Sequence, residues 1–377
     1  MKDNIATHLA AHRQKRGFSA ATLAQRAGIS RQTIYAIESG SYVPNTAVAL
    51  RLARTLEVSV EDLFTLPSDP AADPRPTEHV TLLPQTAPPR AGDPMQLCRV
   101  DRRTMASSPS PIPWYLPTAD AVLVDAPIST GIAAKATVQL FHGEYDLPNR
   151  ILVAGCDPGI SVLARHVLRA GVELVVAQRN SSQSLALLKQ GVVHVAGTHL
   201  RDEASGESNL PAIHRLFARN TVAVISLAVW EEGLVLAPGN PKSIRSVADL
   251  ARRDVAIVNR EPGAGSRLLL DAHLDRLGLA SSKVRGYDRF ARGHLPAAWQ
   301  VRTGDADCCI ATRAAARVFG LDFIPLATER YDLAIRRPHL DHPPVAALLD
   351  TLNRAAFRRE LEGLGGYDTS DAGRRLL

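Results

Sequence analysis

Four polar side chains at the start of one short helical segment have the chemistry needed to read DNA bases. Arg31, Gln32 and Thr33 follow a serine that can begin a helix, and Tyr35 comes one turn later. Guanidinium and amide groups form paired hydrogen bonds with base edges in a major groove, and hydroxyl groups bond to bases or phosphates. The alternative is an ordinary helical hairpin with solvated polar residues. The flanking segments favour DNA recognition.

The surrounding sequence predicts the elements that position these side chains. Small and apolar residues between Ser19 and Gly40 have the spacing of two short helices packed at a corner. Ser19 and Ser30 can cap these helices through their side-chain oxygens. Gly28 can form the turn between them because it has no Cβ. Further amphipathic helices are predicted over residues 5–15, 46–56 and 59–64.

Residues 3–65 resemble the Xre/Cro/C1-type helix-turn-helix repressors. The resemblance implies that Arg31, Gln32 and Tyr35 face bases and that other polar residues approach phosphates. It also implies double-stranded operator DNA as a partner and a homodimer, since such repressors bind paired half-sites. The predicted DNA-binding residues are Gln25, Ser30, Arg31, Gln32, Thr33, Tyr35, Ser41 and Asn45.

Positive charge is denser in this segment than in the rest of the chain. The first 65 residues hold eight Lys and Arg against five Asp and Glu, a net charge of +3, whereas all 377 residues carry +6. Such a surface suits phosphate contacts and predicts salt-sensitive binding. Small domains often carry this charge, so it supports the motif without establishing it.

No pattern points to secretion, a membrane or a disulfide framework. The first predicted helix has no leader before it, and no apolar run has the length of a membrane span. The four cysteines form no Cys-x-x-Cys pair, which favours reduced thiols over disulfides or a zinc site. We therefore expect a cytoplasmic protein without a membrane partner.

Composition divides the chain into four segments. Residues 1–66 form the helical domain, and the proline-rich residues 67–78 have the composition of a linker. Residues 79–148 are expected to be a β-rich connector, and residues 149–377 a further domain. The apolar runs that predict strands in the connector lie at 80–83, 96–100, 121–124 and 136–141.

Strand and helix patterns alternate from residue 150 onward, which predicts parallel sheets with crossover helices. A long extended stretch at 222–241 separates two such sets, and a return near 331–336 would complete a two-lobed, hinged clamp. The predicted strands lie at 151–155, 173–177, 192–197, 254–258 and 307–311, and the predicted helices at 158–170, 182–190, 266–277 and 312–319.

Five phrases of the clamp together resemble the periplasmic-binding-protein-like domain related to molybdate- and tungstate-binding proteins. The resemblance runs over residues 150–370. It implies an α/β, two-lobed, type II binding-protein fold after an all-α helix-turn-helix domain and a small β-rich connector. In periplasmic relatives the ligand is usually a tetrahedral oxyanion. The phrases are GCDPGISVLARHVL (155–168), GVVHVAGTHL (191–200), GLVLAPGNP (233–241), VNREPGAGSRLLLDAHL (258–274) and FGLDFIPLATERYDL (319–333).

Three predicted helix starts could hold such an anion, because backbone N–H groups and the helix dipole favour negative charge there. Several of these residues have structural alternatives. Asp157 can be a helix cap, and Ser181 and Ser182 are common helix-start residues. His199 and Tyr287 can be core residues. An ionised Asp157 would repel a dianion, which leaves a small organic ligand as the alternative to molybdate or tungstate. The predicted ligand-binding residues are Asp157, Ser181, Ser182, His199, Gly265, Ser266, Arg267 and Tyr287.

These patterns favour a one-component transcriptional regulator whose clamp senses a small ligand. A ligand-independent dimeric repressor is the second hypothesis, and an enzyme is the third. The chain has no His-Glu-x-x-His or Gly-x-Ser-x-Gly phrase, so no catalytic residue, metal ligand or cofactor is predicted. The adjacent Glu231 and Glu232 are expected to face solvent near the hinge.

Overall fold

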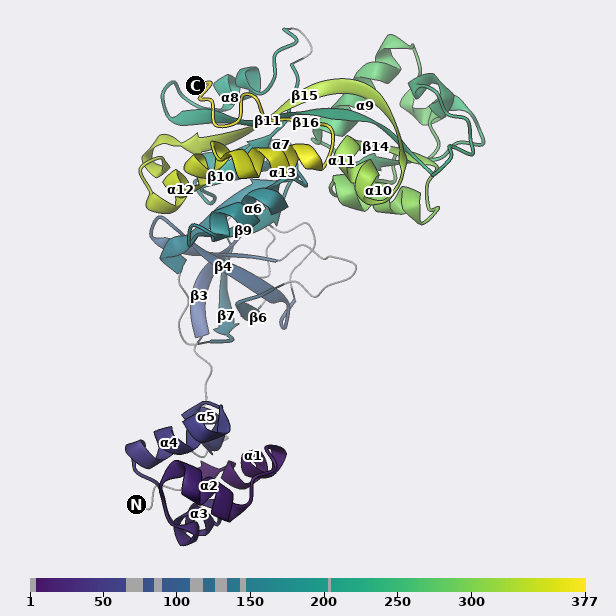
Figure 1. Ribbon diagram of the computed structural model, residues 1–377. Helices are drawn as coiled ribbons and strands as arrows, with labels where there is room; N and C mark the ends of the chain where they lie inside the picture. Colours follow the sequence, from purple (N-terminus) through teal and green to yellow (C-terminus); the bar gives the residue numbers. More distant parts are fainter. Residues whose placement is uncertain are drawn as a thin grey trace. The chain divides into compact units, whose positions relative to one another are not determined.

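The computed structural model describes residues 5–65, 77–84, 90–108, 118–125, 134–142, 147–202 and 205–377. Contacts divide the chain into two units, residues 1–75 and 76–377 (Figure 1). The division into four segments at residues 66, 78 and 148 stays a prediction, and most of the expected linker lies outside the described residues. No helix in the described ranges is both long and apolar enough to cross a membrane.

The first unit is a helical bundle with the predicted helix-turn-helix. Ser19 and Ser30 accept hydrogen bonds from the backbone N–H groups of Thr22 and Thr33, and Gly28 has a φ of 65°, so the predicted caps and turn are confirmed. The helices are α1 (Leu9–Lys15), α2 (Ala20–Ala27), α3 (Arg31–Glu38), α4 (Thr46–Leu56) and α5 (Val60–Leu63).

The start of the first predicted helix is wrong. Ala6 and Thr7 form strand β1 (Ala6–Thr7), which pairs antiparallel with β2 (Phe64–Thr65). Backbone pairing with a distant segment overrides the helical pattern of residues 5–8, so the helix begins only at Leu9.

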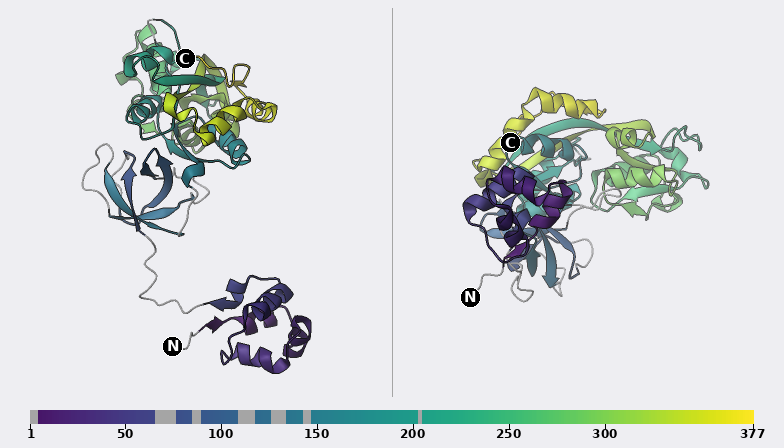
Figure 2. Two further views of the ribbon diagram at one scale, coloured as in Figure 1. Left: turned by 90° about the vertical axis from the view of Figure 1, so that its left-hand side faces the viewer. Right: turned by 60° about the horizontal axis from the view of Figure 1, so that its bottom comes forward.

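The predicted connector strands form a closed five-stranded barrel at the start of the second unit, drawn in blue in Figure 2. Alternate apolar side chains such as Val80, Leu97 and Val138 fill its interior. One strand, Arg103–Ser107, had no sequence prediction. The strands are β3 (Thr77–Leu82), β4 (Pro94–Val100), β5 (Arg103–Ser107), β6 (Ala121–Asp125) and β7 (Lys135–Leu140).

The clamp consists of two lobes that share one sheet, in the strand order β13-β12-β14-β11-β15-β10-β8-β9, with β16 also paired to β11. The first lobe contains β8 (Arg150–Gly155), α6 (Ile160–Leu168), β9 (Glu173–Gln178), α7 (Ser181–Lys189), β10 (Val195–Thr198) and α8 (Leu210–Leu216). The second contains β12 (Ile257–Arg260), α9 (Gly265–Arg276), β13 (Phe290–Ala291), α10 (His294–Arg302), β14 (Cys308–Thr312) and α11 (Arg313–Val318).

Two long antiparallel strands, β11 (Val222–Leu236) and β15 (Asp322–Arg336), run from one lobe to the other (Figure 1). They confirm the predicted crossing and return of a hinged clamp. Bulges interrupt their register at Ser226/Ala228 and Glu232/Gly233. The C-terminal elements α12 (Pro343–Leu352), α13 (Ala355–Gly363) and β16 (Tyr367–Asp368) pack on the first lobe, and short 3-10 turns lie at Leu147–Asn149, Val247–Ala251, Ser281–Lys283 and Arg337–His339.

Arg150 joins the barrel to the first lobe. Its guanidinium donates hydrogen bonds to the Leu97 carbonyl oxygen at 3.0 Å and to Asp120 Oδ2 at 2.7 Å. It also forms an ion pair with Glu173 in β9 at 2.9 Å. Because the arginine is buried, these partners on both sides hold the barrel and lobe together.

Candidate ligand site

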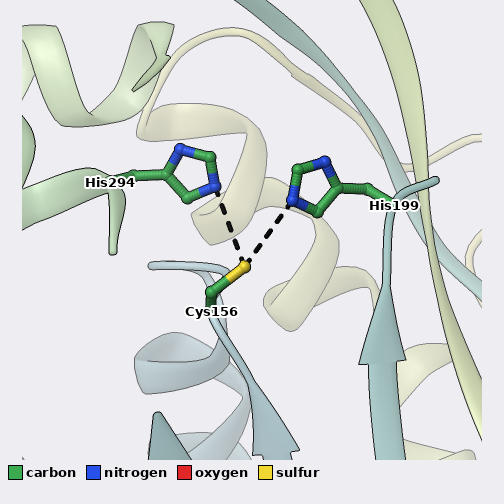
Figure 3. Close-up of side chains that lie close together, drawn as sticks. All are labelled: Cys156, His199 and His294. Carbon is green, nitrogen blue, oxygen red and sulfur yellow. Dashed lines mark hydrogen bonds between the residues drawn. The ribbon is translucent and has the colours of Figure 1, made fainter. Parts of the chain in front are cut away.

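The sulfur of Cys156 lies between two imidazole rings at the base of the clamp (Figure 3). Cys156 Sγ is 3.6 Å from His199 Nε2 and 3.9 Å from His294 Nε2. All three side chains are buried. Cys156 and His199 follow strands β8 and β10 of the first lobe, whereas His294 begins helix α10 of the second. The cluster therefore joins the two lobes.

Two buried glutamates from the crossing strands lie behind the imidazoles. Glu329 Oε2 of β15 is 2.9 Å from His199 Nδ1. Glu232 Oε1 of β11 is 3.7 Å from His294 Nδ1, and its Oε2 is 3.9 Å from His199 Nδ1. Glu232 is fully buried, so the prediction that it faces solvent is wrong; alternation along β11 puts it on the same inward face as Trp230. Glu231 is half-buried and pairs with Arg313.

Burial and mutual proximity shift the protonation of these groups. Burial and the neighbouring Glu329 raise the pKa of Glu232 to about 8, despite the opposing effect of His199. Burial lowers the pKa of His199, but its hydrogen bonds to Cys156 and Glu329 outweigh this and raise it above the ordinary value. Burial, with the charges of Arg260 and His199, lowers the pKa of His294. These shifts favour the protonated form of His199 and the neutral form of His294.

Aromatic rings close the cluster on its inner side. The Trp230 ring lies 4.9 Å from that of His199 and 5.2 Å from that of His294, each in an edge-on arrangement. The Tyr331 hydroxyl accepts a hydrogen bond from the Cys156 backbone N–H at 3.3 Å. These contacts hold the two imidazole rings in place.

Asp157, the first predicted ligand contact, forms hydrogen bonds beside the cluster, in the turn before α6. Its Oδ1 accepts hydrogen bonds from the Gly159 N–H at 2.7 Å and the Tyr367 hydroxyl at 2.6 Å. Burial raises its pKa to about 6 although both bonds oppose the shift. The N-cap of α6 is Gly159, without a side-chain cap bond, so Asp157 is not the helix cap of the structural alternative, and its contact with a ligand stays a prediction.

The start of helix α9 brings two further predicted residues against the site. Ser266 is buried and its hydroxyl donates a short hydrogen bond to Glu232 Oε1. A Cβ on Gly265 would lie 2.5 Å from His199 Nδ1, so only glycine allows this close approach. Ser181 Oγ accepts a hydrogen bond from the His199 N–H at 3.0 Å.

Three predicted residues lie away from the cluster. The Arg267 guanidinium lies over the Tyr287 ring, 4.5 Å from its centroid, and the Tyr287 hydroxyl donates to Asp271 at 2.6 Å. Ser182 is exposed at the start of α7 and lies beside Gly263 of the other lobe. The structure thus brings Asp157, Ser181, His199, Gly265 and Ser266 together, but not Ser182, Arg267 and Tyr287.

A cleft of about 550 Å³ leads from Cys156 to the surface. Arg179 of the first lobe and Arg292 of the second line it, together with Gln178, Gln183 and Glu261. Burial, with the charge of Arg292, lowers the pKa of Arg179. Arg179 donates hydrogen bonds to the carbonyl oxygens of Gln178 and Pro84. Among the described residues, neither guanidinium forms an ion pair with a carboxylate.

Sequence reasoning missed Cys156 as a site residue, as well as His294, Glu232, Glu329, Arg179 and Arg292. The usable signal was topological. Ligands in open α/β sheets bind beyond the carboxyl ends of strands, where Cys156 and His199 lie. The second signal was the position of His294 in the first turn of a helix in the opposite lobe.

The predicted DNA-contact residues form an exposed surface on the first unit. Arg31, Gln32 and Tyr35 are exposed on α3, and Arg31 Nη2 donates a hydrogen bond of 2.8 Å to the Tyr35 hydroxyl. Ser30 and Asn45 cap α3 and α4, which leaves their backbones at helix starts. Thr33 is half-buried and bonds to the Ser30 hydroxyl, whereas Gln25 and Ser41 are exposed.

Comparisons with known proteins agree with this architecture. The PBP superfamily domain matches residues 164–353, half of the chain, and a helix-turn-helix family matches residues 9–63. The chain therefore belongs to the PBP superfamily and carries an Xre-type helix-turn-helix at its N-terminus. The predicted family and fold class are confirmed.

The relatives extend over different parts of the chain. The uncharacterized protein YvgK of Bacillus subtilis is 33% identical over 252 residues, which cover 66% of this chain and 81% of that protein. An uncharacterized HTH-type transcriptional regulator of Methanothermobacter thermautotrophicus is 44% identical over 61 residues, 16% of this chain and 88% of the relative. A putative phosphate ABC transporter substrate-binding protein of Clostridium perfringens is 11% identical, with a TM-score of 0.43, over 58% of this chain and 98% of that chain.

Proposed function

We propose that this protein is a one-component transcriptional regulator in which the helix-turn-helix unit binds operator DNA and the clamp senses a small anion. The single observation that carries the effector class is the pair Arg179 and Arg292. They come from opposite lobes and face the same cleft. An anion between them would form charge-assisted hydrogen bonds to both lobes and would hold the clamp closed.

The charge distribution supports an anion site at the mouth of the cleft. At the base lie the carboxyl groups of Asp157, Glu232 and Glu329, which repel a dianion when ionised. At the mouth, the two guanidinium groups repel each other, and a bound anion would relieve that repulsion. Molybdate and tungstate are the first anions to test, and a small organic carboxylate is the alternative.

Thermal unfolding of the full chain tests the effector class. A ligand that binds the folded state raises the unfolding midpoint by mass action. Molybdate, tungstate, sulfate, phosphate and a panel of organic carboxylates are added singly. We expect one anion class to raise the midpoint, and Arg179→Gln and Arg292→Gln to abolish that rise. Arg289→Gln, an exposed arginine outside the cleft lining, is the matched control.

Operator binding, measured with and without the anion that raises the midpoint, distinguishes a ligand-sensing regulator from a ligand-independent repressor. A sensor requires that the ligand change the operator dissociation constant, because coupling is a difference in affinity between two states. We also propose that the protein is cytoplasmic and binds DNA as a homodimer. Light scattering on the purified chain tests the homodimer. If no anion shifts the midpoint and operator affinity is constant, a ligand-independent repressor is the better description.

A further inference from the structure

We propose that Cys156, His199 and His294 form a binding site for a soft or borderline d-block cation, of which Zn²⁺ is the reference ion. One ligand atom from each residue lies within 4.8 Å of the other two. This site lies deeper than the proposed anion site and does not depend on it.

The distances fit a metal ion between the three atoms. Zinc lies about 2.3 Å from thiolate sulfur and about 2.0 Å from imidazole nitrogen, so a tetrahedral ion separates the two ligands by about 3.5 Å. Cys156 Sγ lies 3.6 Å and 3.9 Å from the two Nε2 atoms. Both sulfur–nitrogen distances are therefore close to those around a bound ion, and the remaining pair of ligand atoms lies within 4.8 Å.

The residues behind the ligands have the arrangement of an outer coordination shell. A metal-binding histidine usually donates its other ring N–H to a carboxylate, which fixes the tautomer. His199 Nδ1 has such a partner in Glu329 at 2.9 Å, which leaves Nε2 facing Cys156 as the nitrogen that would bind a metal ion after losing its proton. His294 Nδ1 faces Glu232 at 3.7 Å and has no hydrogen-bond partner among the described residues. A bound cation would also balance the charge of these buried carboxyl groups.

The same residues could also suggest a cysteine nucleophile with a His–Glu pair, but the groups around the sulfur do not favour acyl transfer. Such chemistry needs hydrogen-bond donors for the oxyanion, which are commonly backbone N–H groups beside the nucleophile. The Cys156 N–H donates to Tyr331, the Gly159 N–H donates to Asp157, and Pro158 has no N–H. The second imidazole, from His294, has no role in that arrangement but is a natural third ligand.

The cleft and the types of ligand atom determine how a metal ion reaches the site and which ions the site favours. Cys156 lines the cleft, which gives an ion a route from solvent and leaves a coordination position open towards the cleft. One thiolate with two imidazoles favours Zn²⁺, Co²⁺ or copper over Mg²⁺ and Ca²⁺, which prefer oxygen ligands.

Titration of the chelator-treated full chain with Co²⁺ and Zn²⁺ tests the site without DNA or anion. We expect one equivalent of Co²⁺ to produce a thiolate-to-cobalt charge-transfer absorption band, and Zn²⁺ to displace it. Cys156→Ser should abolish the band, and His294→Gln should weaken Zn²⁺ binding at least 100-fold in competition with a chromophoric chelator. The matched controls are Cys98→Ser, which removes a buried thiol in the barrel, and His273→Gln in α9.

The cobalt spectrum of the wild-type protein tests the proposed metal site even if a variant fails to fold. Absence of the band in the folded wild type would overturn the proposal, as would an unchanged band in Cys156→Ser. Rapid alkylation of Cys156 by iodoacetamide without any cobalt band would instead favour the nucleophile. Failure of all anions to bind, with the cobalt band present, would reject the proposed effector class and keep the metal site.

Discussion

Gly265 at the start of α9 lies directly against His199, so that an added Cβ would be 2.4 Å from the His199 carbonyl oxygen and 2.5 Å from its ring. This contact joins the second lobe to the centre of the site. It is possible only because the residue at this helix start has no side chain.

Gly265→Ala should therefore separate the lobes or displace His199. We expect a loss of about 1–3 kcal/mol in the free energy of unfolding, the usual cost of overpacking a tight interior. Urea unfolding followed by tryptophan fluorescence measures it. Gly363→Ala is the control, because a Cβ there meets no atom within 4 Å. Equal stability of both variants would contradict the described contact.

Arg31→Ala and Gln32→Ala should each weaken operator binding and alter base preference. A bidentate contact to a base is worth about 1–3 kcal/mol, which corresponds to a loss of roughly 5- to 150-fold in affinity. Selection from a random DNA library followed by fluorescence anisotropy measures both properties. Gln14→Ala, on the exposed surface of α1, should leave them unchanged. Specific binding that survives both substitutions in α3 would refute the assignment of its DNA-contact residues.

The buried His194 predicts a loss of stability in acid. Its Nδ1 accepts a hydrogen bond from the Leu152 N–H at 3.0 Å, and burial, with the charges of His339 and His342, lowers its pKa from 6.5 to about 3. Between these values the unfolded state binds more protons than the folded state. Stability is therefore complete above pH 6.5 and falls as the pH decreases, by up to about 1.4 kcal/mol per pH unit.

His194→Asn retains an acceptor for the Leu152 N–H but removes the titration. We expect its unfolding free energy to decrease less than that of the wild type between pH 6.5 and pH 5, as measured by urea unfolding at each pH. The exposed His214→Asn variant should follow the wild type. Parallel curves for all three proteins would mean that His194 is not held neutral by the fold.

Arg150→Met should strongly destabilise the second unit. It leaves the buried Asp120 without its ion-pair partner, and breaking a buried pair costs about 3–5 kcal/mol. Arg215→Met is the comparison, because Arg215 also pairs with an aspartate but is largely exposed, so its loss should cost less than about 1 kcal/mol. Chemical unfolding measured by circular dichroism distinguishes the two costs. Similar values would show that the Arg150 contacts contribute little.

Local patterns predicted most elements because the physical causes were local. Ser19, Ser30 and Gly28 determine the helix-turn-helix through caps and one left-handed residue, all visible in a short stretch of sequence. The crossing strand β11 was predicted from its length and apolar content, whereas only residues 331–336 of β15 were predicted. Strand β1 was missed because its pairing partner lies about 58 residues away, and β-pairing depends on such partners more than on propensity.

The site was predicted less well because it is assembled from distant positions. Cys156, His199 and His294 stand apart in the sequence and form no spaced motif, so the cysteine pattern indicated no metal site. Glu232 was misplaced because the two adjacent glutamates were assigned to solvent together, whereas alternation along β11 turns Glu232 inward with Trp230 and leaves Glu231 half-buried. Arg267 is a suitable anion ligand by type, yet the Tyr287 ring holds it elsewhere.

The bonds of Arg150 have a mechanical consequence. They fasten the barrel to the first lobe, whereas the second lobe connects to the rest through β11, β15 and the contacts at the site. Side-chain bonds thus join the barrel to the first lobe, whereas the two strands β11 and β15 connect the first lobe to the second. In the proposed sensor, the ligand would set the angle between the two lobes, and that angle would be the signal.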